Sequence, residues 1–89
     1  MTRADVAWSR TDAEGASLEV YAHQVGSRWV FYSRPGRDAE WKPLGEPPLE
    51  DWLEVLDAVR RRTQRRRYGP EVASKLEAEL RRRFPRAKF

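Results

Sequence analysis

The chain has 89 residues, of which 39% are hydrophobic and 36% are charged, with four Trp, no Cys and a formal charge of +4. This length allows one domain with a modest core, and the lack of Cys excludes disulfide bridges and thiolate metal sites. No apolar run approaches membrane-spanning length, and Met1–Asp5 lacks the apolar core of a signal peptide, so we expect a cytoplasmic protein without a membrane partner.

The first half of the chain predicts short β-strands separated by turn residues. β-branched and aromatic residues alternate with polar ones in four runs, and Gly or Pro occurs in the segments between them. We expect strands at residues 6–10, 18–23, 28–34 and 39–42. They predict an antiparallel β-meander of three to four strands over residues 6–42, preceded by a loose end at residues 1–5.

Loop composition suggests how these strands pair. Closing the first hairpin about Ala13 and the second about Val25 and Gly26 places the large apolar side chains of both hairpins on one face. The expected pairs are Val6–Val20, Trp8–Leu18, Val20–Phe31 and Ala22–Trp29. A loop at Pro35-Gly36-Arg37 would set Trp41 opposite Phe31 on the same face, whereas a one-residue slip would turn it outward. We prefer the first arrangement because it buries an indole, and Trp8, Trp29, Trp41 and Trp52 then share one interior.

The second half of the chain predicts two helices. Leu49, Trp52, Leu53, Leu56 and Val59 recur at helical spacing, so we expect a helix over residues 49–67, or one that ends near Val59. A second helix over residues 70–84 follows, with Gly69 ending the first in the left-handed conformation and Pro70 opening the second. Residues 85–89 form a loose end. The fold class is therefore α+β, a single domain over residues 1–89 in which a helical hairpin within residues 49–84 packs on one face of the meander.

Charge is distributed unevenly along the chain. Residues 1–59 carry six basic and eleven acidic side chains, a balance of −5, whereas residues 60–89 carry twelve basic and three acidic ones, a balance of +9. Such asymmetry indicates an anionic partner. Part of the arginine excess reflects codon usage, because Lys, Ile and Asn, which AT-rich codons encode, are jointly scarce.

Three arginine triplets, at residues 60–62, 65–67 and 81–83, are the strongest functional signal. Arginine binds phosphate through a planar fork, but three consecutive helical residues point in different directions, so each triplet spreads its charge around the axis. Pairs four residues apart share a side and are the better phosphate ligands. The candidates are Arg61, Arg62, Arg65, Arg66, Arg67 and Arg82. The alternative is that the triplets are solvated helix ends balanced by Glu77 and Glu79.

A second set of candidates falls on the outer face of the predicted sheet. Tyr21 and Tyr32, with Arg28, Arg34 and Lys42 near them, would stack on unpaired bases and neutralise phosphates. The alternative is that these residues are ordinary cross-strand pairs of an exposed sheet, which the acidic balance of the strand region favours.

No pattern predicts catalysis. His23 is the only His, so a metal site would rest on carboxylates alone, and a ribonuclease built on His23, Arg28 and Tyr21 has no supporting spacing. We therefore expect a small non-enzymatic nucleic-acid-binding accessory protein without a cofactor, whose arginine-rich helices contact phosphates of DNA or RNA. The alternative is a protein-interaction or structural module, as a homodimer or bound to an acidic protein surface, in which Glu50, Glu54 and Asp57 offer an acidic flank.

Overall fold

A computed structural model describes residues 5–26, 28–65 and 69–88 of the chain. The chain divides into two compact units, residues 1–46 and residues 47–89. The first is an antiparallel sheet and the second contains two helices, which confirms the α+β class and the order of strands before helices. The packing of the helices on the sheet, and the union of both units in one domain, stay predictions.

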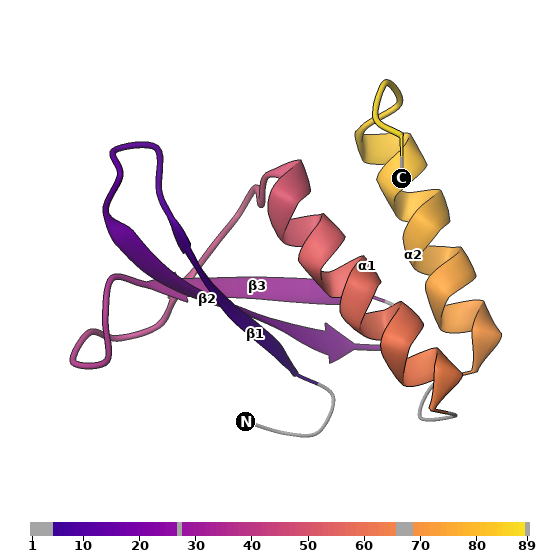
Figure 1. The fold of residues 1–89 in the computed structure, drawn as a ribbon, viewed down its shortest axis with the longest axis horizontal. Coiled ribbons are helices and arrows are strands. Elements are labelled where there is room, and N and C mark those ends of the chain that lie inside the picture. Colours follow the sequence, from indigo (N-terminus) through magenta and orange to yellow (C-terminus); the bar gives the residue numbers. More distant parts are fainter. Residues whose placement is uncertain (1–4, 27, 66–68, 89) are drawn as a thin grey trace. The chain divides into compact units, whose positions relative to one another are not determined.

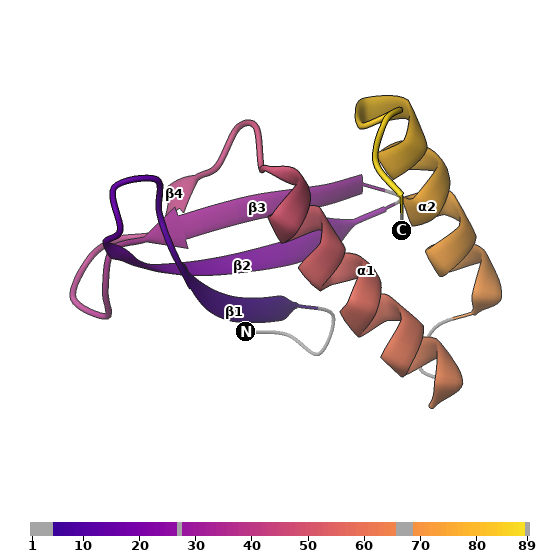
Figure 2. The ribbon, with the colours of Figure 1, turned by 45° about the horizontal axis from the view of Figure 1, so that its top comes forward.

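The N-terminal unit is a four-stranded antiparallel meander in which each strand pairs with the next along the chain (Figures 1 and 2). Its strands are β1 (Val6–Thr11), β2 (Ser17–Val25), β3 (Arg28–Arg34) and β4 (Lys42–Pro43). One face carries the buried side chains Val6, Val20, Ala22 and Phe31, and the edge of the Trp8 ring packs against Phe31 with ring centres 6.2 Å apart. These are the residues that strand alternation assigns to a single face.

Both hairpins keep the predicted faces but shift the predicted register by two residues. Ala22 lies opposite Phe31 instead of Trp29, and Trp8 lies opposite Val20 instead of Leu18. The turns explain the shift. Gly26, with φ 62°, is the first residue of the loop between the paired residues Val25 and Arg28. A two-residue hairpin loop needs a positive φ at this position, which glycine adopts readily. An even shift preserves the face that every side chain occupies.

In the first hairpin the turn is set by Asp12 and Gly15. The Asp12 carboxylate accepts hydrogen bonds from the N–H groups of Glu14 and Ala16, both at 2.9 Å, and Gly15 has φ 82°. An Asp at the start of the loop and a Gly in the left-handed region together close it about Glu14 and not about Ala13.

The predicted position of Trp41 is wrong. Strand β4 begins only at Lys42, which pairs with Ser33, so the register differs from the predicted one by an odd number and the face is reversed. The Trp41 indole meets Tyr21 edge-on at 4.6 Å, on the outer face of the sheet. The prediction that four Trp share one interior therefore fails, and Lys42 lies on the face of Ser33 instead of beside the tyrosines.

The C-terminal unit is a pair of antiparallel helices, α1 (Leu49–Gln64) and α2 (Pro70–Arg83) (Figure 1). The buried side chains of α1 include Trp52, Val55, Leu56 and Val59, close to the predicted stripe, and those of α2 are Leu76 and Leu80. Asp51, an acidic residue, is fully buried in the first turn of α1.

The ends of the two helices can be compared with the predicted ones. Helix α1 includes Arg60–Gln64 and is capped by Arg65, whereas residues 66–68 lie outside the described ranges. Pro70 opens α2 as predicted, but Gly69 has φ −70° and precedes α2 in an extended conformation instead of a left-handed one. Helix α2 ends at Arg83, one residue before the predicted end.

Candidate nucleic-acid interface

The last turn of α1 presents exposed arginines to solvent. Arg61 lies 3.3 Å from the carboxylate of Asp57, one turn earlier, and both side chains are about two-thirds exposed. Arg65, the residue that caps the helix, is exposed, and no ion pair of its guanidinium is seen within the described ranges. We call Arg60, Arg61, Arg62 and Arg65 the α1 cluster.

Glu77 links the α1 cluster to the second helix. Its carboxylate accepts a hydrogen bond at 2.9 Å from Arg60 of α1 and lies 3.8 Å from Arg81 of its own helix. The contact fixes the relative position of two helices that run in opposite directions, so the end of α1 lies near the start and middle of α2 (Figure 1).

The end of α2 carries a second group, Arg81, Arg82 and Arg83, which we call the α2 cluster. Glu79 accepts hydrogen bonds from Arg82 and, at 2.6 Å, from Arg83. These two bonds, Arg82 first, hold the pKa of Glu79 below its ordinary value of 4.5. The Arg83 guanidinium also lies 5.0 Å from the centre of the Trp52 ring in α1, a cation–π distance.

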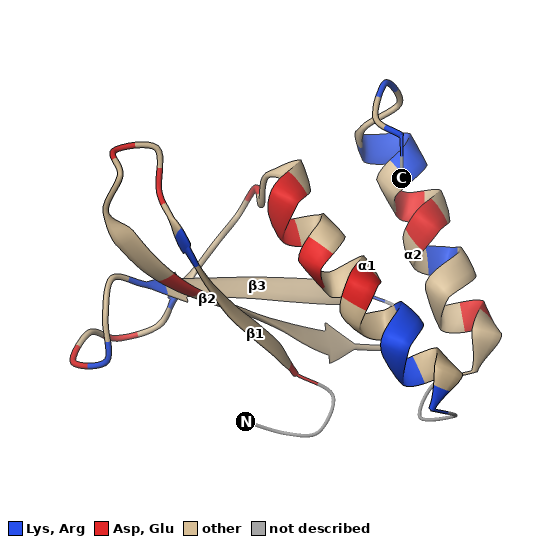
Figure 3. Ribbon diagram, in the orientation of Figure 1, with Lys and Arg blue, Asp and Glu red and all other residues tan. Residues whose placement is uncertain are grey.

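The two clusters lie at opposite ends of the helix pair (Figure 3). Each occupies the C-terminal end of its helix, and antiparallel helices place those ends apart. The Arg83–Trp52 contact brings the α2 cluster to the first turn of α1, where Glu50 and Asp51 lie. The carboxylate partners of the α2 cluster are Glu77 and Glu79 of its own helix. In the α1 cluster, Arg61 pairs with Asp57 and Arg60 pairs with Glu77.

The structure brings part of the predicted sheet surface together. Tyr21 and Tyr32 lie directly opposite each other on β2 and β3 and stack with ring centres 4.9 Å apart. Burial raises the pKa of the Tyr21 hydroxyl, and Tyr32 and Asp5 add to the rise. Arg28 lies at the far end of β3, opposite Val25, and Lys42 is on the other face, so neither joins the tyrosines.

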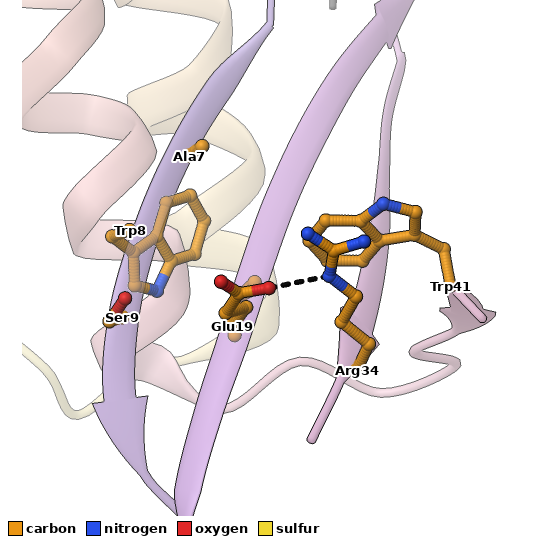
Figure 4. A pocket seen from close by; sticks show the side chains of 7 residues that line it. Ala7, Trp8, Ser9, Glu19, Arg34 and Trp41 are labelled. Atoms are coloured by element: carbon orange, nitrogen blue, oxygen red, sulfur yellow. Dashed lines mark hydrogen bonds and ion pairs between the residues drawn. The ribbon is translucent and has the colours of Figure 1, made fainter. Parts of the chain in front are cut away.

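Arg34 is held in place by two neighbours that sequence reasoning did not foresee. Its Nε donates to the Glu19 carboxylate at 2.5 Å, and its guanidinium carbon lies over the Trp41 ring, 4.3 Å from the ring centre (Figure 4). Pairing of Glu19 with Arg34 follows once the register is known, because the two residues are directly opposite. The contact between Arg34 and Trp41 was not predicted because the expected register places Trp41 on the opposite face of the sheet.

A shallow hollow of about 250 Å³ lies beside this group (Figure 4). It is lined by Ala7, Trp8, Ser9, Glu19, Val20, Arg34 and Trp41. The small side chains of β1 on one side and the Arg34–Trp41 pair on the other account for the depression. Elsewhere in this unit, His23 contacts the Asp5 carboxylate through Nδ1 at 2.5 Å, which attaches the residue before β1 to β2.

Of the predicted ligands, Arg61, Arg62 and Arg65 lie together at the end of α1, whereas Arg82 belongs to the opposite end of the helix pair. Arg66 and Arg67 lie outside the described residues. The expected balancing of arginines by Glu77 and Glu79 is present for Arg60, Arg81, Arg82 and Arg83. The predicted arginine ligands that the structure describes are therefore divided between the two ends of the helix pair.

Neither helix, as far as the structure describes them, is long and apolar enough to cross a membrane. In the same ranges, no group of three or more His, Asp or Glu side chains is arranged to hold a metal ion. Comparison of the chain with protein-family models, with curated proteins and with solved structures gave no match.

Proposed function

We propose that the protein is a non-enzymatic nucleic-acid-binding accessory protein whose α1 cluster contacts phosphates. The observation that carries the proposal is the group of arginines at the end of α1, of which Arg60, Arg61 and Arg65 are exposed. Arg61 pairs with Asp57, and Arg60 pairs with Glu77, which also lies near Arg81. Arg66 and Arg67 follow directly in the sequence and add to the positive charge. A cytoplasmic location, where nucleic acid is accessible, belongs to the same proposal.

The ion pairs of the α1 cluster do not prevent phosphate binding. Exposed pairs such as Arg61–Asp57 contribute only about 0–1 kcal/mol, so a phosphate can replace Asp57 at little cost. Arg61 and Arg65 are four residues apart and share a side of the helix, which suits two neighbouring phosphates. Contacts of this kind position the protein on a nucleic acid without reading its sequence.

The outer face of the sheet has a subordinate place in this proposal. Tyr21 and Tyr32 already stack on each other, and Arg34 is bonded to Glu19, so this surface has little unused charge for phosphates. Tyr21, Arg28, Tyr32 and Arg34 remain candidates for contacts to unpaired bases. Binding that relies on α1 is expected with both duplex and single-stranded ligands.

The proposal is tested by removing equal charge from the two clusters. Fluorescence anisotropy with labelled duplex DNA, single-stranded DNA and RNA would compare Arg61→Gln/Arg65→Gln with Arg81→Gln/Arg82→Gln. We expect the first variant to bind about tenfold more weakly at moderate salt, with a salt slope shallower by about 2. The second, which loses the same charge from the α2 cluster, is expected to change affinity far less.

Two results would contradict the proposal. One is the absence of binding to all three ligands at low salt. The other is an equal loss in both double variants, which would show that only net charge matters and that the end of α1 is not the site.

A further inference from the structure

Strand β1 forms an open edge of the sheet. It pairs with β2 on one side, and in the strand order β1-β2-β3-β4 no other strand of the described residues lies on its other side (Figure 2). The opposite edge is shortened and interrupted, because β4 has only two residues and one of them is Pro43. An unpaired strand of six residues is a template for another extended segment.

The hairpin identifies which backbone groups point outward. Asp12 N–H donates to the Ala16 carbonyl at 2.8 Å, so Asp12 and Ala16 are a hydrogen-bonded pair. Pairs alternate along an antiparallel ladder, and Arg10, Trp8 and Val6 therefore direct their backbone groups to β2. The N–H and C=O groups of Ala7, Ser9 and Thr11 point to the open side.

These outward groups are available for hydrogen bonding. No hydrogen bond to the backbone of Ala7 or Ser9 from this side is seen among the described residues. Thr11 accepts one from the exposed Arg10 side chain at 3.1 Å. Ala7, Ser9 and Thr11 are all exposed, and their small side chains offer none of the Lys, Pro or bulge devices that block natural sheet edges.

We propose that β1 pairs antiparallel with β1 of a second copy of this chain, with the two-fold axis at Ser9. A two-fold dimer needs a surface that complements itself, and an antiparallel pair of identical edge strands meets that condition. In this register Ser9 faces Ser9 of the second copy and Ala7 faces Thr11. All three outward residues of β1 then find partners, and about six main-chain hydrogen bonds form.

Side chains on both faces accept this register. On the outer face the residues that meet are Ala7, Ser9 and Thr11, next to the hollow beside β1, so no bulky group is displaced. On the other face Arg10 comes opposite Trp8 of the second copy, where a cation–π contact can form. Shifting the axis to Trp8 would leave Thr11 without a partner inside the strand.

The dimer is expected to dissociate on dilution. The free energy gained from a few main-chain hydrogen bonds only slightly exceeds the free-energy cost of the translational and rotational entropy lost on association. Sedimentation over a wide concentration series measures it. Ser9→Lys and Ser9→Glu should each abolish the dimer, since like charges meet at the axis, and an equimolar mixture of the two should restore it. Ser74→Lys, at an exposed serine of α2, is the matched control and should leave the dimer intact.

A second variant tests the axis directly. The chain has no Cys, so Ser9→Cys introduces a single thiol. Residues paired by hydrogen bonds across antiparallel strands lie about 5.5 Å apart, within disulfide range. Oxidation should link Ser9→Cys into covalent dimers much faster than the control Ser74→Cys. A wild type that stays monomeric at every concentration, a dimer that survives Ser9→Lys, or equal cross-linking of both thiols would each overturn the proposal.

Discussion

Glu79 shows most clearly how a carboxylate pairs with neighbouring arginines. It holds Arg82 and Arg83 of its own helix, and these bonds lower its pKa below 4.5. All three arginines in the α2 cluster thus have a carboxylate within the same helix, because Arg81 lies near Glu77. At the end of α1, Arg61 pairs with Asp57 of its own helix and Arg60 with Glu77 of the other. The value of an arginine for binding therefore depends on its neighbours and not on its number in the sequence.

The lowered pKa predicts how acid affects stability. A carboxylate with a folded-state pKa below its unfolded value stabilises the protein above about pH 4.5 and loses this contribution as the pH falls through the lowered pKa. Urea unfolding should therefore show Glu79→Gln less stable than wild type at neutral pH, with the difference shrinking below pH 4.5. Glu71→Gln, in the first turn of α2, controls for loss of a carboxylate. A Glu79→Gln difference that stayed constant with pH would contradict this explanation.

At the scale of elements, the helix pair is held in register at both ends. Arg60 reaches across to Glu77, and Arg83 reaches back to Trp52. Both contacts involve arginines that would otherwise be counted as free ligands. Within the triplets, Arg60 and Arg83 therefore connect the two helices.

A double-mutant cycle tests the contact between the helices. We expect Arg60→Gln and Glu77→Gln to be coupled by about 0.2–1 kcal/mol in unfolding free energy, reduced by added salt, because the pair is largely exposed. The same cycle with Glu71, which lies in the first turn of α2, should give coupling near zero. Equal coupling in both cycles would indicate a general charge effect instead of a specific bond.

The sequence predicted the elements well and their pairing less well. Hydrophobic periodicity located α1, α2, β2 and β3 within a few residues, since burial repeats at the period of each element. The register depended on Asp12, Gly15 and Gly26, whose turn geometry a symmetric loop ignores. Trp41 was misplaced because its face depends on the register of β3 with β4, in which Ser33 pairs with Lys42, and the loop composition did not determine that register.

At the scale of the whole molecule, the described arginines that contribute to the +9 charge of residues 60–89 do not lie on one surface. Antiparallel helices carry the two arginine clusters to opposite ends (Figure 3), and each arginine of the α2 cluster has a carboxylate partner on its own helix. Neither this division nor the ion pair between helices could be read from periodicity, because they depend on how the helices pair. The open edge of β1 belongs to the other unit, so nucleic-acid binding and self-association can be measured separately.

The salt dependence of duplex DNA binding tests the central claim most directly. If Arg61, Arg62 and Arg65 each contact a phosphate, log K should fall linearly with log salt concentration with a slope of about −3, because each contact releases condensed counterions. A flat dependence, or no binding at low salt, would contradict the account of the α1 cluster as the site where this protein meets nucleic acid.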